Sequence, residues 1–287
     1  MKKASEVERA AVLGSGTMGH GIAHVLALAG IETRLYDVAQ GFLDQALQRI
    51  RGNLDVGVEK KKVAPEARER ALAYLSVTTE LGTAIRGVDL VIEAVPETLA
   101  LKRELFGELG RSLGAEVLLA TNTSSLSVAK IAEAARDPER VLGMHFFNPV
   151  HVMKLVEVVQ APKSSAEAVA LALELARRMG KDPIRVQDSP GFASSRLGLV
   201  LGLEAIRMVE AGVATPQDID KAMKLGYGFP MGPLELTDLV GLDVRLSIAE
   251  VLAQEIGARF EPPQLLREKV ARGELGKKSG RGFYAWD

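Results

Sequence analysis

Short runs of apolar residues alternate with helical patterns through the first half of the chain. Most of these runs are continuously apolar, which is typical of strands buried on both faces of a sheet. The alternation predicts the α/β class, with a Rossmann-type, doubly wound parallel sheet covered by helices. The seven strand-like runs span residues 9–14, 32–37, 89–95, 116–121, 141–147, 154–160 and 182–188.

The pattern changes at about Ser189, after which apolar positions recur at helical spacing to the end of the chain. We therefore expect two domains, an α/β domain over residues 1–188 and an all-helical domain over residues 189–287. A helical stretch over about 41–74, interrupted near Pro65, is longer than an ordinary crossover between two strands. It predicts a helical arm on the first domain.

Composition and charge exclude several classes of partner. The 287 residues include 36 basic and 37 acidic side chains, for a formal net charge of −1, so nothing favours nucleic acid or an anionic membrane. Cysteine is absent, which excludes disulfides and thiolate chemistry and suits a reducing compartment. Neither a signal peptide nor an apolar run of membrane-spanning length is evident, and we expect a soluble, cytoplasmic protein.

Residues 14–19 read GSGTMG, a G-x-G-x-x-G loop that directly follows the first strand and opens a helix. Its glycines permit a tight turn, backbone approach to a pyrophosphate and close helix packing, while the helix N-terminus faces the phosphates. An aspartate at the end of the second strand would bind the adenosine ribose and repel a 2′-phosphate, which favours NAD over NADP. A plain glycine turn is the alternative. The expected NAD contacts are Gly14, Gly16, Thr17, Met18, Gly19 and Asp37.

A histidine and a glutamate stand out in the apolar stretch GMHFFNPVHVMKLVEVV. His145 ends one predicted strand and Glu157 lies in the next, so a strand–loop–strand path can bring them together. A neutral histidine can take a hydroxyl proton as hydride leaves the adjacent carbon, and a carboxylate can fix its tautomer. From the residues alone, a structural buried pair is an equal alternative. His20 and His24 share a face of the first helix without the other residues of a metal motif.

Several motifs, in order, resemble the 3-hydroxyacyl-CoA dehydrogenase family. They are GSGTMGHGIA, TNTSSL, HFFNPVHVMKLVEVV, IDKAMKLGYGFPMGPLELTDLVGLD and GKKSGRGFY, and they cover nearly the whole chain. The resemblance is to short, single-function members such as 3-hydroxybutyryl-CoA dehydrogenases. It implies an NAD-binding Rossmann domain and a helical domain for substrate binding and homodimerisation. The implied reaction is reversible NAD-dependent oxidation of (3S)-3-hydroxyacyl-CoA, in fatty acid or butyrate metabolism.

The resemblance also implies roles for individual residues. His145 matches the family's general base, Glu157 its orienting partner, and Ser124 the serine that holds the substrate oxygen. On the arm, Asn53 and Lys60 match positions that meet CoA, whose phosphates suit a basic face. Further positions match residues near the cofactor, namely Glu97, Lys102, Asn122, Asn148 and the tail residue Lys278.

Three positions depart from the family pattern, the mildest being Asn53, where many members have serine. Ser195 stands before Arg196 where the family has asparagine, and a serine cannot donate through an amide. We expect Ser195 to belong to the active site and to alter rate or substrate range. His151, where proline is frequent, is the rival candidate base. Two other functions stay open: a dehydrogenase of a free hydroxy acid or sugar acid, and a non-catalytic NAD-binding protein.

Overall fold

The structure is a computed structural model that describes all 287 residues, and the chain divides into two compact units. Unit 1 covers Met1–Ser189 and unit 2 covers Pro190–Asp287. Each unit has hydrophobic cores of its own. None of the helices combines the length and the apolar character that crossing a membrane requires.

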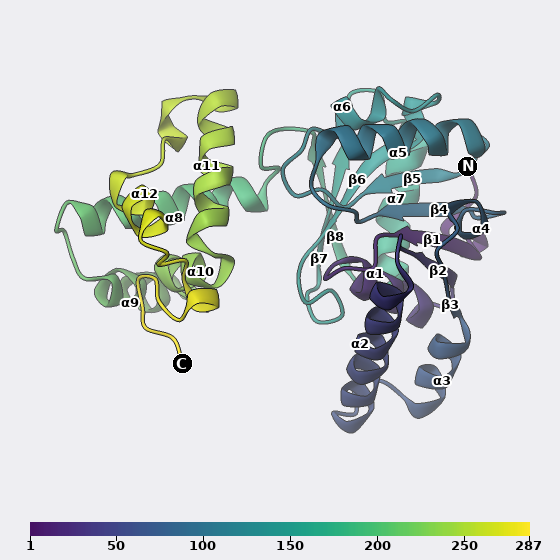
Figure 1. The fold of residues 1–287 in the computed structure, drawn as a ribbon, viewed down its shortest axis with the longest axis horizontal. Coiled ribbons are helices and arrows are strands. Elements are labelled where there is room, and N and C mark those ends of the chain that lie inside the picture. Colours follow the sequence, from purple (N-terminus) through teal and green to yellow (C-terminus); the bar gives the residue numbers. More distant parts are fainter. The chain divides into compact units, whose positions relative to one another are not determined.

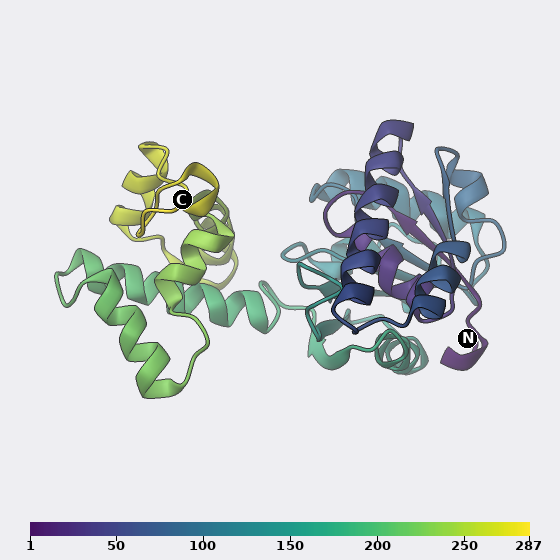
Figure 2. The same ribbon diagram turned by 90° about the horizontal axis from the view of Figure 1, so that it is seen from below.

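An eight-stranded sheet forms the centre of unit 1, in the order β3-β2-β1-β4-β5-β6-β7-β8 (Figures 1 and 2). Adjacent strands are parallel except β6 and β7. The loop between those two strands is too short for the crossover that parallel pairing needs. The strands are β1 (Arg9–Leu13), β2 (Glu32–Tyr36), β3 (Leu75–Thr78), β4 (Leu90–Glu93), β5 (Leu118–Thr121), β6 (Val141–Phe146), β7 (Leu155–Gln160) and β8 (Asp182–Gln187).

Strand β3 is the one strand that the sequence pattern does not predict. Its four residues, LSVT, form an edge of the sheet and stay partly exposed. They therefore lack the apolar run that marks a strand buried on both faces. The other seven strands coincide with the predicted runs, and the predicted α/β class is confirmed. The antiparallel β6–β7 pair is the exception within the predicted parallel sheet.

Helices cover both faces of this sheet. In β1, Ala10 and Val12 face one core while Ala11 and Leu13 face the other, because successive side chains of a strand point to opposite faces. The first core includes residues of α1 (Gly19–Leu28), α2 (Gln40–Glu59), α3 (Pro65–Ala73) and α7 (Ala166–Arg178). The second includes residues of α4 (Leu81–Ala84), α5 (Leu99–Ser112) and α6 (Val128–Ala132).

The predicted helical arm is formed by α2 and α3, which project from the sheet in Figure 1. Pro65 is at the first turn of α3, where its missing N–H costs nothing. The side chains that anchor α2 recur at helical spacing and end at Leu54, so the rest of the helix towards the tip of the arm is solvent-facing. Each buried leucine or isoleucine of this stripe contributes roughly 1.5–3 kcal/mol.

Unit 2 is all-helical, apart from short turns and isolated bridges. Leu199, Leu203, Leu234 and Leu252 are among the residues of its core. Its helices are α8 (Ser194–Glu210), α9 (Pro216–Tyr227), α10 (Pro233–Val240), α11 (Leu242–Ile256) and α12 (Gln264–Ala271). Short 3₁₀ turns lie at Ala4–Glu6 and Pro138–Arg140 in unit 1 and at Ala258–Phe260 and Lys277–Ser279 in unit 2.

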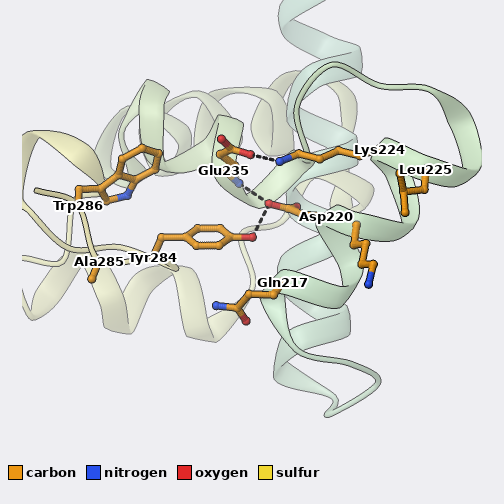
Figure 3. Close-up of a pocket in the computed structure, with 9 residues that line it drawn as sticks. Gln217, Asp220, Lys224, Leu225, Glu235, Tyr284, Ala285 and Trp286 are labelled. Atoms are coloured by element: carbon orange, nitrogen blue, oxygen red, sulfur yellow. Dashed lines mark hydrogen bonds and ion pairs between the residues drawn. The ribbon is translucent and has the colours of Figure 1, made fainter.

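A buried aspartate joins three segments of unit 2 (Figure 3). The Asp220 carboxylate accepts hydrogen bonds from the backbone N–H groups of Leu234 and Glu235, each at 2.8 Å, and so holds the N-terminus of α10. The Tyr284 hydroxyl donates to the same carboxylate at 2.7 Å. These contacts fix the C-terminal tail and occupy the Asp220 carboxylate. The Glu235 carboxylate, the other acidic group of the cavity of about 510 Å³ drawn in Figure 3, accepts a hydrogen bond from Lys224 at 2.5 Å.

Candidate active site

The glycine loop after β1 has the backbone geometry that its sequence predicts. Gly14 has φ 97°, and a Cβ there would lie 2.6 Å from the Ala94 carbonyl oxygen. A Cβ on Gly19 would lie 1.7 Å from the Gly14 carbonyl oxygen, so α1 can begin here only with glycine. A Cβ on Gly16 would meet nothing within 4 Å. The loop therefore presents an open stretch of backbone at the N-terminus of a helix, a natural phosphate site.

The Asp37 carboxylate, just beyond β2, is fixed against this loop. Its Oδ2 accepts hydrogen bonds from the backbone N–H and the hydroxyl of Ser15, both at 2.7 Å. Its Oδ1 accepts from the Val38 N–H at 2.8 Å. Ser15 is a contributor that the sequence analysis did not single out, although it lies inside the GSGTMG motif.

A cavity of about 730 Å³ runs over the loop and the carboxylate. Its walls are largely apolar and include Val38, Phe42, Leu101 and Leu105. An apolar slot beside a fixed carboxylate and a helix N-terminus offers what an adenosine diphosphate needs: a surface for the base, an acceptor for the ribose and donors for the phosphates. These residues therefore fit NAD.

His145 and Glu157 stand directly opposite each other in the antiparallel β6–β7 pair. The imidazole Nδ1 lies 2.8 Å from Oε2 of Glu157, whose side chain is fully buried. A carboxylate only accepts hydrogen bonds, so Nδ1 carries the proton and Nε2 is the nitrogen that can act as a base. The Phe147 ring packs against the imidazole, with 4.5 Å between ring centroids.

His145 lines a second cavity of about 370 Å³, which shares Ala94 and Val95 with the nucleotide cavity. Asn122, at the end of β5, accepts a hydrogen bond from the Phe146 N–H at 2.9 Å and so ties that strand end to the histidine's strand. Seven predicted residues line this second cavity: Met18, Glu97, Lys102, Asn122, Ser124, His145 and Asn148. It therefore gathers residues from five places in the sequence.

Glu97 organises the turn that carries Ser124. Its Oε1 accepts hydrogen bonds from the Thr123 hydroxyl at 2.5 Å and from the Ser124 N–H at 2.9 Å. Burial disfavours the charged form, but the Lys102 ammonium and these donors outweigh it and hold the pKa of Glu97 below its usual range. The Ser124 hydroxyl is thereby positioned at the cavity by an ionised carboxylate.

Lys102 is a buried cation, 1% exposed, shared by two carboxylates. Its Nζ lies 2.6 Å from Glu93 Oε1 and 3.2 Å from Glu97 Oε2. Burial raises the pKa of Glu93, while Lys102 and a hydrogen bond from Thr121 oppose that shift. Glu93 was missed by the sequence analysis. The signal was present, because it is a charged residue inside the apolar strand DLVIEAV, as Glu157 is in LVEVV.

Four predicted site residues, Asn53, Lys60, Ser195 and Lys278, are not among the residues that line these two cavities. Asn53 lines a third cavity in unit 1, of about 660 Å³, to which Lys62 rather than Lys60 contributes. Ser195 lies in the first turn of α8 and Lys278 in the C-terminal tail, both in unit 2. The Lys278 ammonium forms an ion pair with Asp243 at 2.6 Å.

The rival histidine, His151, stacks on His24, with ring centroids 5.4 Å apart and an interplanar angle of 7°. Burial lowers the pKa of both rings, assisted by neighbouring positive groups that include Lys181. Both line the third cavity rather than the one that contains His145. Their arrangement supplies no carboxylate that would hold either ring as a base.

Two family models match this chain. The model for the NAD-binding domain of 3-hydroxyacyl-CoA dehydrogenase matches residues 9–189, and the model for that family's C-terminal domain matches residues 191–286. Together they cover both structural units, and they confirm the resemblance and the NAD cofactor that the motifs predict.

Individual relatives agree with the family models. The 3-hydroxybutyryl-CoA dehydrogenase of Mycobacterium tuberculosis H37Rv is 44% identical over 98% of this chain and 99% of its own length. The 3-hydroxyadipyl-CoA dehydrogenase of Escherichia coli K12 is 45% identical over 98% of this chain and 59% of its own length. The crystal structure of (S)-3-hydroxybutyryl-CoA dehydrogenase from Ralstonia eutropha is 36% identical, with a TM-score of 0.95 over 98% of this chain and all of that one. This chain therefore belongs to the 3-hydroxyacyl-CoA dehydrogenase family, a family of NAD-dependent oxidoreductases.

Proposed function

We propose that this protein catalyses the reversible, NAD-dependent oxidation of (3S)-3-hydroxyacyl-CoA to 3-ketoacyl-CoA. The observation that carries the proposal is the hydrogen bond between His145 and Glu157 in a cavity that adjoins the nucleotide loop. A buried histidine–glutamate pair can be purely structural. Here the histidine of the pair lines a cavity together with polar residues of other strand ends, which is what a reacting site requires.

His145 acts as the general base in the oxidation. With its Nδ1 proton directed at Glu157, its Nε2 takes the proton of the substrate's 3-hydroxyl. When bound, NAD supplies the hydride acceptor at nicotinamide C4. The Glu157 carboxylate stabilises the imidazolium that results, and in the reverse direction that imidazolium protonates the developing alkoxide. Ser124, held by Glu97, donates a hydrogen bond to the same substrate oxygen.

The NAD contacts assigned from the sequence are part of the same proposal. The loop residues and Asn148 hold the dinucleotide, and Asp37 accepts hydrogen bonds from the adenosine ribose. Lys102 acts indirectly, because its ammonium is occupied by Glu93 and Glu97. A direct contact of Lys278 with the cofactor requires this residue to leave Asp243.

The arm of unit 1 binds the CoA moiety. The third cavity is lined by Asn53 of α2 and by the cations Lys62 and Lys154, and a phosphate-bearing ligand complements such a surface. The same surface favours a CoA thioester as the substrate, rather than the free hydroxy acid that the alternative function would use. Comparing acetoacetyl-CoA with acetoacetate as substrates separates the two functions, and equal turnover of both would remove the CoA ester from the proposal.

Unit 2 carries Ser195 and the surface that we propose for a homodimer. Ser195 begins α8 and contacts the substrate where the family has asparagine. Ser195→Asn is expected to change kcat/KM for acyl-CoA substrates several-fold, and an unchanged profile would contradict this role. Exposed apolar side chains favour an interface on this unit; they are Leu197, Leu201, Val213, Leu225, Tyr227, Phe229, Leu236, Leu239, Val240, Val244 and Val251. The cytoplasmic location stays a prediction from the sequence.

Steady-state kinetics test the proposed function. Wild-type protein should reduce acetoacetyl-CoA with NADH in preference to NADPH, because Asp37 repels a 2′-phosphate. Asp37→Ala should raise the KM for NADH and narrow the preference between the two cofactors. Absence of turnover with any 3-ketoacyl-CoA would refute the function.

A further inference from the structure

Arg245 is a buried cation without a counter-charge in unit 2. It lies on the first turn of α11, is 6% exposed, and its Nε makes no hydrogen bond. Burial alone acts on its pKa, lowering it to about 10, and no carboxylate lies close enough to oppose that shift. Arg140 in unit 1 provides the contrast: its Nε also makes no hydrogen bond, but four backbone carbonyls accept hydrogen bonds from its terminal nitrogens.

A guanidinium withdrawn from water without a partner is unfavourable for the folded protein. A protein that needs a cation only to stabilise its fold would pair it, as Arg140 is paired. An anionic ligand that arrives from outside the fold would complete the partners of Arg245. A carboxylate suits the planar fork of a guanidinium, since it can accept two parallel hydrogen bonds.

The guanidinium lies beside Gly198 of α8. A Cβ added at Gly198 would lie 3.7 Å from one terminal nitrogen of Arg245 and 4.0 Å from the other. Gly198 itself is only half-buried. A side chain at this position would therefore pack against the guanidinium, and the glycine leaves that side of the guanidinium without one.

Ser195 is three residues before Gly198 and shares that face of α8. The two positions are about 4.5 Å apart along the helix axis, a span of roughly three to four carbon–carbon bonds. If the 3-position of the substrate meets Ser195, a group roughly three to four carbons further along the acyl chain would reach Arg245. That group lies near the sixth or seventh carbon of the chain.

We propose that Arg245 binds a carboxylate at the far end of the acyl chain, so that the preferred substrates are 3-hydroxyacyl-CoA thioesters of dicarboxylic acids. This inference rests on the proposed function and on the place of Ser195 in it. The inference specifies the acyl group of the substrate. Two relatives that are about equally similar to this chain are named for different acyl groups, hydroxybutyryl and hydroxyadipyl. The other source of a carboxylate is an acidic residue of a second copy of this chain.

Two substrates of equal chain length test the inference. These substrates are 3-oxoadipyl-CoA and 3-oxohexanoyl-CoA, and only the first has a terminal carboxylate. The assay measures kcat/KM for each of them with NADH. Wild-type protein should favour the dicarboxylic thioester at least tenfold. Arg245→Met should abolish that preference, while kcat/KM for 3-oxohexanoyl-CoA stays within twofold. Arg272→Met, an exposed arginine at the end of α12, is the matched control and should change neither value.

Other outcomes overturn the inference. If Arg245→Met lowers both kcat/KM values equally together with the melting temperature, Arg245 is structural. If the variant becomes monomeric in sedimentation while wild-type protein is dimeric, the carboxylate belongs to a second copy of the chain. A wild-type protein that turns over 3-oxohexanoyl-CoA as well as 3-oxoadipyl-CoA refutes the inference and leaves the proposed function intact. Turnover of neither thioester refutes the proposed function itself.

Discussion

Two buried histidines of unit 1, His145 and His24, meet opposite chemical surroundings. His145 is 7% exposed, and Glu157 lies 2.8 Å from its Nδ1. His24 is 2% exposed, and its Nδ1 has no hydrogen-bond partner. Burial, with smaller contributions from His151, His20 and Lys181, lowers the pKa of His24 to about 3. Burial by itself therefore does not make a base, and the difference lies in the paired carboxylate and the cavity.

The largest expected effect comes from removing the paired histidine. His145→Ala should lower kcat for acetoacetyl-CoA reduction by about 10³-fold or more, since it deletes both the proton donor and its position beside the substrate. Stopped-flow or steady-state assays with NADH measure this. A near-normal kcat in His145→Ala would contradict the proposal that His145, unlike His24, is the catalytic base.

Removing the charge of the partner tests why the pair works. Glu157→Gln keeps the shape of the side chain but removes the carboxylate that fixes the tautomer and stabilises the imidazolium. We expect kcat to fall by about 10²–10³-fold, with a smaller change in KM. A loss of protein stability without this kinetic effect would make the pair structural.

The unpaired histidine should affect stability rather than catalysis. The unfolded chain binds a proton at His24 below about pH 6.5, whereas the native state does not until about pH 3. Its contribution to stability is therefore present above pH 6.5 and is lost as the pH falls towards 3, at about 1.4 kcal/mol per pH unit.

The matching experiment compares His24→Gln with wild-type protein in urea at pH 7.5 and pH 4.5. The variant should lose about 2–3 kcal/mol less of its free energy of unfolding over this range. Its kcat should stay within twofold of wild type. An identical pH dependence in His24→Gln and wild type would contradict the lowered pKa.

The smallest effect is expected from the rival base. His151→Gln removes the ring that stacks on His24 and lines the third cavity. The kcat for acetoacetyl-CoA should remain within twofold of wild type, and any change should appear in the KM for the CoA thioester. A loss of kcat comparable to that of His145→Ala would transfer the role of base to His151.

Particular residues show how far the sequence reaches. Seven strands, the arm and the nucleotide loop follow from apolar runs and glycine positions, which are local features. Glu157 could be singled out because a carboxylate inside an apolar strand needs a partner, and that partner was within twelve residues. Glu93 is also a carboxylate inside an apolar strand, but its partners are the Lys102 ammonium of α5 and the Thr121 hydroxyl of β5. No spacing in the sequence indicates those contacts.

The sequence by itself determined the α/β architecture with its helical second unit, the NAD loop with Asp37, and the candidate base with its carboxylate. These depend on residue type and short spacings, and the backbone carries such information directly. Only the tertiary structure decided that β7 runs antiparallel to β6, so that His145 faces Glu157. Only it showed that Nδ1 of His24 and Nε of Arg245 are buried without a hydrogen-bond partner, while the Lys102 ammonium has two carboxylates. The reason is physical: the free energy of a buried charge depends on which distant segments pack around it.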